Sequence, residues 1–172
     1  MSTPRHHLRA IVAPLLVTAL CGVSGSAQEL IGAQPMVTAT GARALVDACL
    51  AYAKANRQRV GIAVVDPHGN LLDYHTMEGT NVIAGESAIL KAKTAVRWRQ
   101  PTEQLNARVL KEENVAPVWI GDFPQRGGVP IFVKGEIVGG MGIGGGGGDE
   151  CAKAAIAEVL KNASTTPPST AP

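Results

Sequence analysis

His75 and Met77 are the residues of this sequence whose types and spacing best suit binding of a metal or cofactor. They lie in LLDYHTM, 71–77, whose alternation predicts a β-strand. Side chains two apart in a strand share a face, so the imidazole and the thioether would act together, with His75 as the metal ligand. If Leu72 and Tyr74 face the core, this pair faces the other side, where a neighbouring subunit could cover it. An ordinary surface or interface histidine also explains His75.

Lys93 and Arg97 are a second pair with useful chemistry. They stand one helical turn apart in a predicted helix over 83–99, so the two cations could clamp a carboxylate. A solvated basic face explains them as well. His68, in the sequence PHGN over 67–70, is interpreted as an exposed turn residue.

Five consecutive glycines, 144–148, precede Asp149 and Glu150. One interpretation is a tight turn from a strand into a helix, and the other is a ligand cradle that uses Gly145 and Gly146. The segment is not a dinucleotide fingerprint or a Walker loop, because an early βαβ unit and a Lys-Ser or Lys-Thr pair are both missing.

The sequence lacks the residues that several other kinds of functional site require. The sequence has no CxxC, no HExxH and only two histidines beyond residue 27, too few ligands for a dedicated zinc site. It has no nucleophile elbow. Aromatic residues make up 3% of the chain, so no platform for stacking nucleic-acid bases is expected.

Residues 1–27 are typical of a secretory signal. Arg5 and Arg9 precede an apolar stretch over 10–20, which is too short to span a bilayer, and small residues precede a predicted cut after Ala27. We therefore expect a periplasmic or secreted protein without a membrane span. A lipoprotein anchor at Cys21 is the alternative, although Leu20 is large for that role.

Beyond residue 27 the chain has 14 basic and 14 acidic residues, so its charge gives no case for nucleic-acid binding. Cys49 and Cys151 each lie among alanines in a helical pattern. They are either two small core residues or a disulfide, which an exported protein could form, and the sequence leaves both open.

The apolar pattern predicts both the helices and the strands. Helices are expected from Thr38, as N-cap, to about 55, and over 83–99, 101–113 and 149–161. One hairpin should turn at 67–70, and a second should join 129–133 to 137–143. We expect one short strand and a loop over 115–128. This order favours an α+β domain over 28–161, with a mainly antiparallel sheet of about five strands flanked by helices, followed by a disordered tail over 162–172.

Three separated blocks resemble the GlcG/HbpS family, which is described as haem-binding or haem-degrading. They are GIAVVDPHGNLLDYHTMEG, ILKAKTAVRWRQPTEQL and RGGVPIFVKGEIVGGMGIGGGGGDECAKAAI, in the family's order. The resemblance runs from about Val37 to Leu160. It implies a profilin-like fold, assembly into homo-oligomers and, for some members, binding of haem or a related tetrapyrrole. The sequence lacks the Glu-x-x-Glu pair associated with iron binding in secreted members.

The resulting hypothesis is an exported haem-binding protein that could support slow haem degradation or redox sensing, with His75 and Met77 as candidate ligands and Lys93 and Arg97 near the propionates. A binding protein is favoured over a dedicated enzyme. One alternative is an enzyme or binding protein for a small 2-hydroxy or 2-oxo acid such as glycolate. The other is a structural accessory subunit that only assembles.

Overall fold

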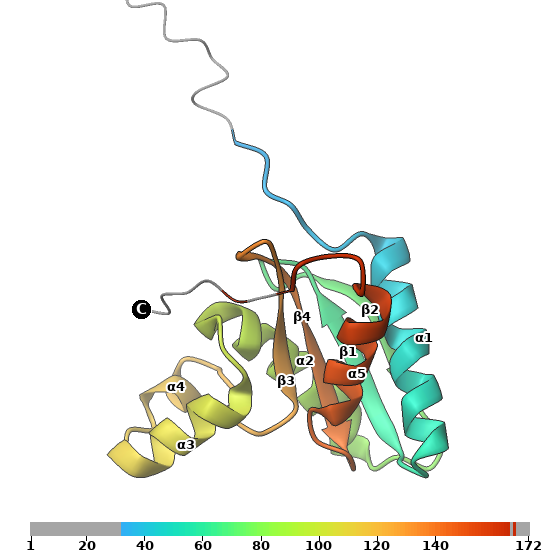
Figure 1. The fold of residues 1–172 in the computed structure, drawn as a ribbon. Helices are drawn as coiled ribbons and strands as arrows, with labels where there is room; N and C mark the ends of the chain where they lie inside the picture. The colour runs from blue at the N-terminus through green and yellow to red at the C-terminus, as the bar shows by residue number, and fades with distance from the viewer. Residues whose placement is uncertain (1–31, 166, 168–172) are drawn as a thin grey trace, which may run out of the picture. The chain divides into compact units, whose positions relative to one another are not determined.

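The computed structural model describes residues 32–165 and 167 (Figure 1). These residues form, in order, α1 (Ala39–Ala55), β1 (Val60–Val65), β2 (Leu71–Thr76), α2 (Val82–Trp98), α3 (Thr102–Glu112), α4 (Ala116–Trp119), β3 (Gly128–Val133), β4 (Glu136–Gly145) and α5 (Glu150–Val159). The predicted signal segment, 1–27, lies outside the described residues, as do 166 and 168–172 of the predicted tail. No helix in the described part of the chain is long and apolar enough to cross a membrane.

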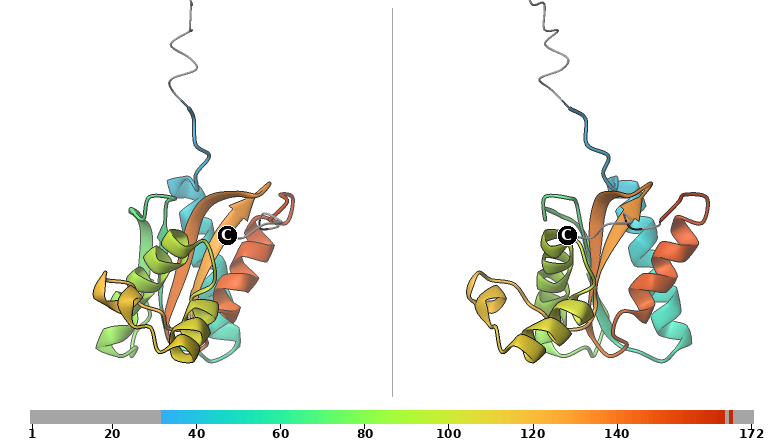
Figure 2. Two further views of the ribbon diagram at one scale, coloured as in Figure 1. Left: turned by 90° about the vertical axis from the view of Figure 1, so that its left-hand side faces the viewer. Right: turned by 60° about the vertical axis from the view of Figure 1, so that its left-hand side comes forward.

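The four strands form one sheet in the order β2-β1-β4-β3, and every neighbouring pair is antiparallel. Helices cover both faces: α1 and α5 lie together on one, and α2, with α3 beside it, lies on the other (Figures 1 and 2). The predicted α+β class, both hairpins and the antiparallel sheet are confirmed.

The first helix forms where its sequence predicts it. The Thr38 hydroxyl accepts a hydrogen bond from the Gly41 N–H at 3.1 Å and so caps the N-terminus of α1. Its apolar positions pack against α5 and the sheet in the main core, and Cys49 forms a disulfide with Cys151 of α5. The Cα atoms of these cysteines are 5.1 Å apart, within the range that a disulfide spans.

Alternate glycines of β4 allow α2 to lie directly on the sheet backbone. A Cβ atom at any of these glycines would collide with the backbone of α2, so the close approach requires glycine. The intervening residues Met141 and Ile143 point the other way, into the main core. Gly140 faces Ala92, Gly142 faces Ala88 and Gly144 faces Ala84.

The glycine run also makes the predicted crossing from the last strand to the last helix. Gly145, Gly147 and Gly148 have φ values of +91°, +109° and +58°, in the left-handed region that favours glycine. A Cβ atom at Gly146 would meet nothing within 4 Å. Two requirements, close packing before the turn and left-handed backbone within it, therefore account for most of the run.

The prediction of a short strand within 115–128 is wrong. Residues 116–119 form the helical turn α4, in which the Val118 N–H donates to the Val115 carbonyl at 2.9 Å. Pro117 lies in the first turn of α4, where its missing N–H costs no hydrogen bond. The β-branched residues here suggested a strand, and its loss leaves four strands instead of about five.

The expectation that Leu72 and Tyr74 point to the same face of the sheet is also wrong. The register of β2 shifts opposite Val64 and Val65, and the bulge makes Leu72 an extra residue. Leu72 packs against the main core beside α1, whereas the Tyr74 hydroxyl points to α2. His75 lies on the α1 side of the sheet. Because helices cover both faces, it does not face an open side of the sheet.

Candidate functional site

His75 and Met77 line the same pocket, between the end of α1 and strand β2. We call it the His75 pocket, and its volume is about 770 Å³, within the range of small-molecule sites. Its walls come from α1, from the segment that leads into β1, and from the end of β2. The lining residues are Leu50, Lys54, Arg57, Gln58, Arg59, His75, Thr76, Met77 and Glu78.

The strand pairing places the two candidate ligands in this pocket. His75 pairs with Ile62 across the β1–β2 ladder, and the Met77 N–H donates to the Val60 carbonyl at 3.1 Å. Both side chains are half-buried, and Met77 also packs against the main core. The imidazole of β2 and the thioether of the residue just after the strand therefore reach one cavity.

The charge of the His75 pocket is positive. Lys54, Arg57 and Arg59 are exposed cations at its wall, and Glu78 is the one acidic residue among those that line it in the described structure. The pocket thus combines nitrogen and sulfur ligands with cations. This set fits haem, whose iron takes such ligands and whose propionates pair with cations.

Lys93 and Arg97 lie elsewhere, in a pocket of about 620 Å³ beside the β1–β2 turn that also includes His68. We call it the Lys93 pocket. Arg97 donates to the Asp122 carboxylate at 2.8 Å and to the Ile120 carbonyl at 3.2 Å. Its guanidinium group is therefore already engaged within the chain.

Gly145 and Gly146 lie at a third pocket, which Lys91 of α2 also lines. The structure thus brings the predicted residues together in pairs: His75 with Met77, Lys93 with Arg97, and Gly145 with Gly146. Within one chain the three pairs line three separate pockets and do not form one site.

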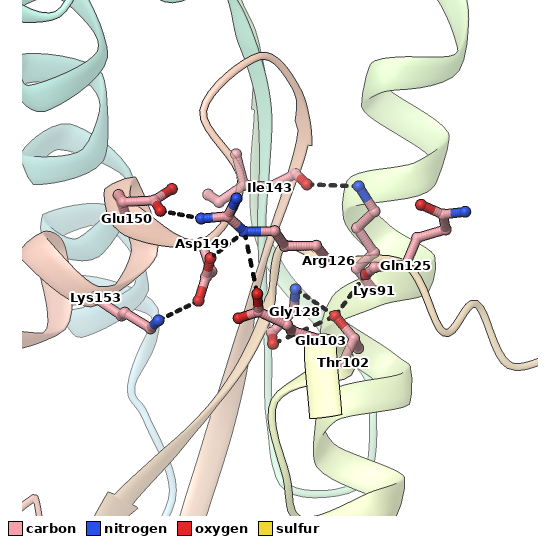
Figure 3. A network of polar contacts seen from close by, with 10 residues as sticks. All are labelled: Lys91, Thr102, Glu103, Gln125, Arg126, Gly128, Ile143, Asp149, Glu150 and Lys153. Carbon is pink, nitrogen blue, oxygen red and sulfur yellow. Dashed lines mark hydrogen bonds and ion pairs between the residues drawn. The ribbon is translucent and has the colours of Figure 1, made fainter. Parts of the chain in front are cut away.

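Lys91 was missed as a functional residue from the sequence. Its side chain is buried, and its Nζ atom donates a hydrogen bond to the Ile143 carbonyl at 3.0 Å (Figure 3). Burial lowers the pKa of Lys91, since removal from water disfavours the charged ammonium group. Helical spacing contained the signal, because Lys91 follows Ala88 by three residues and precedes Ala95 by four, on the apolar side of α2.

A polar network at the start of α5 was also missed (Figure 3). Arg126 donates to the buried Asp149 carboxylate at 2.8 Å and pairs with Glu150, while Lys153 forms an ion pair with Asp149 from one helical turn further on. Burial alone raises the pKa of Asp149, but the hydrogen bonds from Lys153 and Arg126 outweigh burial and hold the pKa below its ordinary value. This network fastens the end of the glycine run to the loop before β3.

Comparison with known proteins agrees with the resemblance seen in the sequence. The Escherichia coli K12 protein GlcG is 34% identical over 105 residues, which cover 59% of this chain and 76% of GlcG. The structure of a double mutant of HbpS from Streptomyces reticuli has 28% identity and a TM-score of 0.70, and covers 87% of this chain and 98% of that one. The structure of a PduOC:haem complex has 26% identity and a TM-score of 0.66, and covers 72% and 93% of the two chains.

These likenesses confirm the predicted profilin-like α+β fold. The sequence model of the family described as "Haem degrading protein HbpS-like" matches residues 37–159. Because the match spans well over half of the sequence, the chain belongs to the HbpS-like family.

Proposed function

We propose that this protein binds haem in the His75 pocket and acts as an exported binding protein rather than as a dedicated enzyme. The observation that carries the proposal is the meeting of His75 and Met77 in one pocket with three cations at its wall. The printed description of the family as haem-degrading, and of the PduOC relative as a haem complex, support it.

In this proposal each lining residue has a defined task. His75, or Met77 beside it, would ligate the iron, and Lys54, Arg57 and Arg59 would pair with the propionates. Leu50 would contact the macrocycle. Bound haem supplies a redox-active iron, so slow degradation of the macrocycle with oxygen and a reductant, or redox sensing, would be properties of the cofactor that the protein holds.

A visible-light titration of haem into the purified protein tests the proposal. We expect saturable binding with a Soret band that His75→Ala weakens strongly. His68→Ala is the matched control, because His68 is the other histidine of the described residues and lines the Lys93 pocket. Haem uptake that does not saturate, or that His75→Ala and His68→Ala reduce equally, would contradict the proposal.

We also propose that residues 1–27 direct the protein to the periplasm or out of the cell. The disulfide between Cys49 and Cys151 supports this, since such bonds persist in oxidising compartments. Mass spectrometry of the protein from its native cells should find an N-terminus at Gln28. An intact N-terminus on protein recovered from the cytoplasm would contradict export.

The exposed apolar residues of the α4 region support a homo-oligomer. Trp119 is 81% exposed and Ile120 is 62% exposed, and Val118 lies beside them. Clustered apolar residues of this size commonly mark protein contacts. Light scattering after gel filtration should give an oligomer for the natural protein and smaller species for Trp119→Lys. A monomeric natural protein at micromolar concentration would contradict this part of the proposal.

A further inference from the structure

The third pocket lies next to the proposed haem site, with which it shares Arg59, and has a different chemical character. We call it the Lys91 pocket. Its volume is about 500 Å³, and it lies between the first half of α2, the end of β4 and the segment that follows α4. Lys91 and Ser87 belong to α2. Gly145 and Gly146 belong to the glycine run, and Arg59 is the residue just before β1.

Lys91 is a charged side chain in an unusual setting. The residue is only 8% exposed, and its one described hydrogen bond goes from Nζ to the Ile143 carbonyl. An ammonium group can donate three hydrogen bonds, so two donors remain. The Phe123 ring centroid lies 5.9 Å from Nζ and provides an apolar wall with weak attraction for the cation. Buried lysines are rare unless a negative partner compensates the charge.

No such partner is present in the described structure. Neither Lys91 nor Arg59 forms an ion pair with a carboxylate anywhere in residues 32–165 and 167. No aspartate or glutamate of the described residues lines the pocket. The buried Lys91 and the exposed Arg59 therefore line one cavity to which the described residues contribute no carboxylate.

Glycines keep the pocket open and place the lysine. Gly127 makes room for the Ile143 carbonyl that accepts the hydrogen bond of Lys91, because a Cβ atom there would collide with that oxygen. At the rim, Gly146 has an ordinary φ value, and a Cβ atom on it would meet nothing within 4 Å. The space beside Gly146 is therefore free for a ligand rather than filled by packing.

We infer that the Lys91 pocket binds a small carboxylate, with Lys91 pairing with the anion from within and Arg59 from the edge. Charge-assisted hydrogen bonds from the free donors of Lys91 would supply the compensation that the protein lacks. The two sites differ in Lys91, which lines this pocket and not the His75 pocket, and they share Arg59, which borders both.

Calorimetric titration with oxalate, at constant ionic strength, tests the inference. We expect saturable binding with one oxalate per chain, weakened at least about tenfold in Lys91→Met, which loses a charge-assisted hydrogen bond. Lys93→Met is the matched control, because Lys93 is an exposed lysine two residues further along α2 and lies outside this pocket. Its oxalate affinity should equal that of the natural protein.

A second variant decides the matter if Lys91→Met does not fold. Gly146→Asp places a carboxylate at the rim without a steric clash and should weaken oxalate binding. The haem Soret band should persist in the same samples, so a failed carboxylate site and a failed haem site give different results. Absent oxalate binding, equal binding in the Lys91→Met or Gly146→Asp variant, or tighter binding of phosphate than of oxalate would each overturn the inference.

Discussion

The Nζ atom of Lys91 donates a hydrogen bond to the carbonyl oxygen of Ile143, 3.0 Å away and 52 residues further along the chain. The bond joins α2 to β4 just before the glycine run. It also holds the buried amine in the lining of the Lys91 pocket, and this burial gives the first prediction.

The stability of the protein should rise at alkaline pH because of Lys91. Burial lowers the pKa of Lys91 in the folded state below its ordinary value of 10.5, so the unfolded chain binds more protons between these two pKa values. Stability therefore rises with pH through that window. Urea unfolding from pH 8 to about 10.5 should show a smaller rise for Lys91→Met than for the natural protein. Parallel curves would contradict the prediction.

Asp149 should give a dependence of the same sign at acidic pH, where stability falls as the pH falls. Its folded pKa lies below its ordinary value of 3.8, so its stabilising contribution is complete above that value and is lost as pH falls through the folded pKa. Asp149→Asn should destabilise the protein at pH 7. Its stability should then decline less than that of the natural protein between pH 5 and pH 2. Carbon NMR of the Asp149 carboxyl would check the pKa directly.

The glycines facing α2 should not tolerate a methyl group. Gly142→Ala would press a Cβ atom into the Ala88 carbonyl, which is backbone and cannot move aside, at a cost of about 3 kcal/mol in the free energy of unfolding. Gly146→Ala, four residues further along the chain, is the matched control, with an effect of about 0.5 kcal/mol or less. Thermal unfolding measures both, and equal effects would contradict the proposed packing role.

The disulfide should contribute strongly to stability. It links residues 102 apart and restricts the unfolded chain, so its loss should cost about 2–5 kcal/mol. Denaturant unfolding of the natural protein with and without reductant should show this difference. The double variant Cys49→Ala and Cys151→Ala should be equally unstable in both conditions. A natural protein that is indifferent to reductant would show that the bond does not form.

Local sequence patterns predicted the parts of the fold that local interactions decide. Thr38 and the apolar series after it predicted α1, and the alternation around the Pro67 and Lys134 turns predicted both hairpins. The bulge at Leu72 and the helical turn at Pro117 were missed because tertiary packing decides them.

The site was predictable to a similar extent. A spacing of two brought His75 and Met77 together, since β2 carries His75 and Met77 follows the end of the strand. Lys93, Arg97, Gly145 and Gly146 remain predicted ligand-binding residues, and their distribution over separate pockets depends on how α2 crosses the sheet. The cations Arg57 and Arg59 were missed because they precede β1 and have no helical or strand period.

The pairing of alanines with glycines also sets which side of α2 can face β4. Four helical residues advance about 6.0 Å and two strand residues about 6.8 Å, so each alanine in turn meets the next glycine. A rotation of α2 by one residue, about 100° around its axis, would bring Gly85, Ile89 and Lys93 to the glycines, and the side chains of Ile89 and Lys93 are too large to approach the backbone. The helix is therefore fixed in one rotational setting. Any motion that widens the Lys91 pocket must move α2 without such a rotation or displace the segment around Phe123.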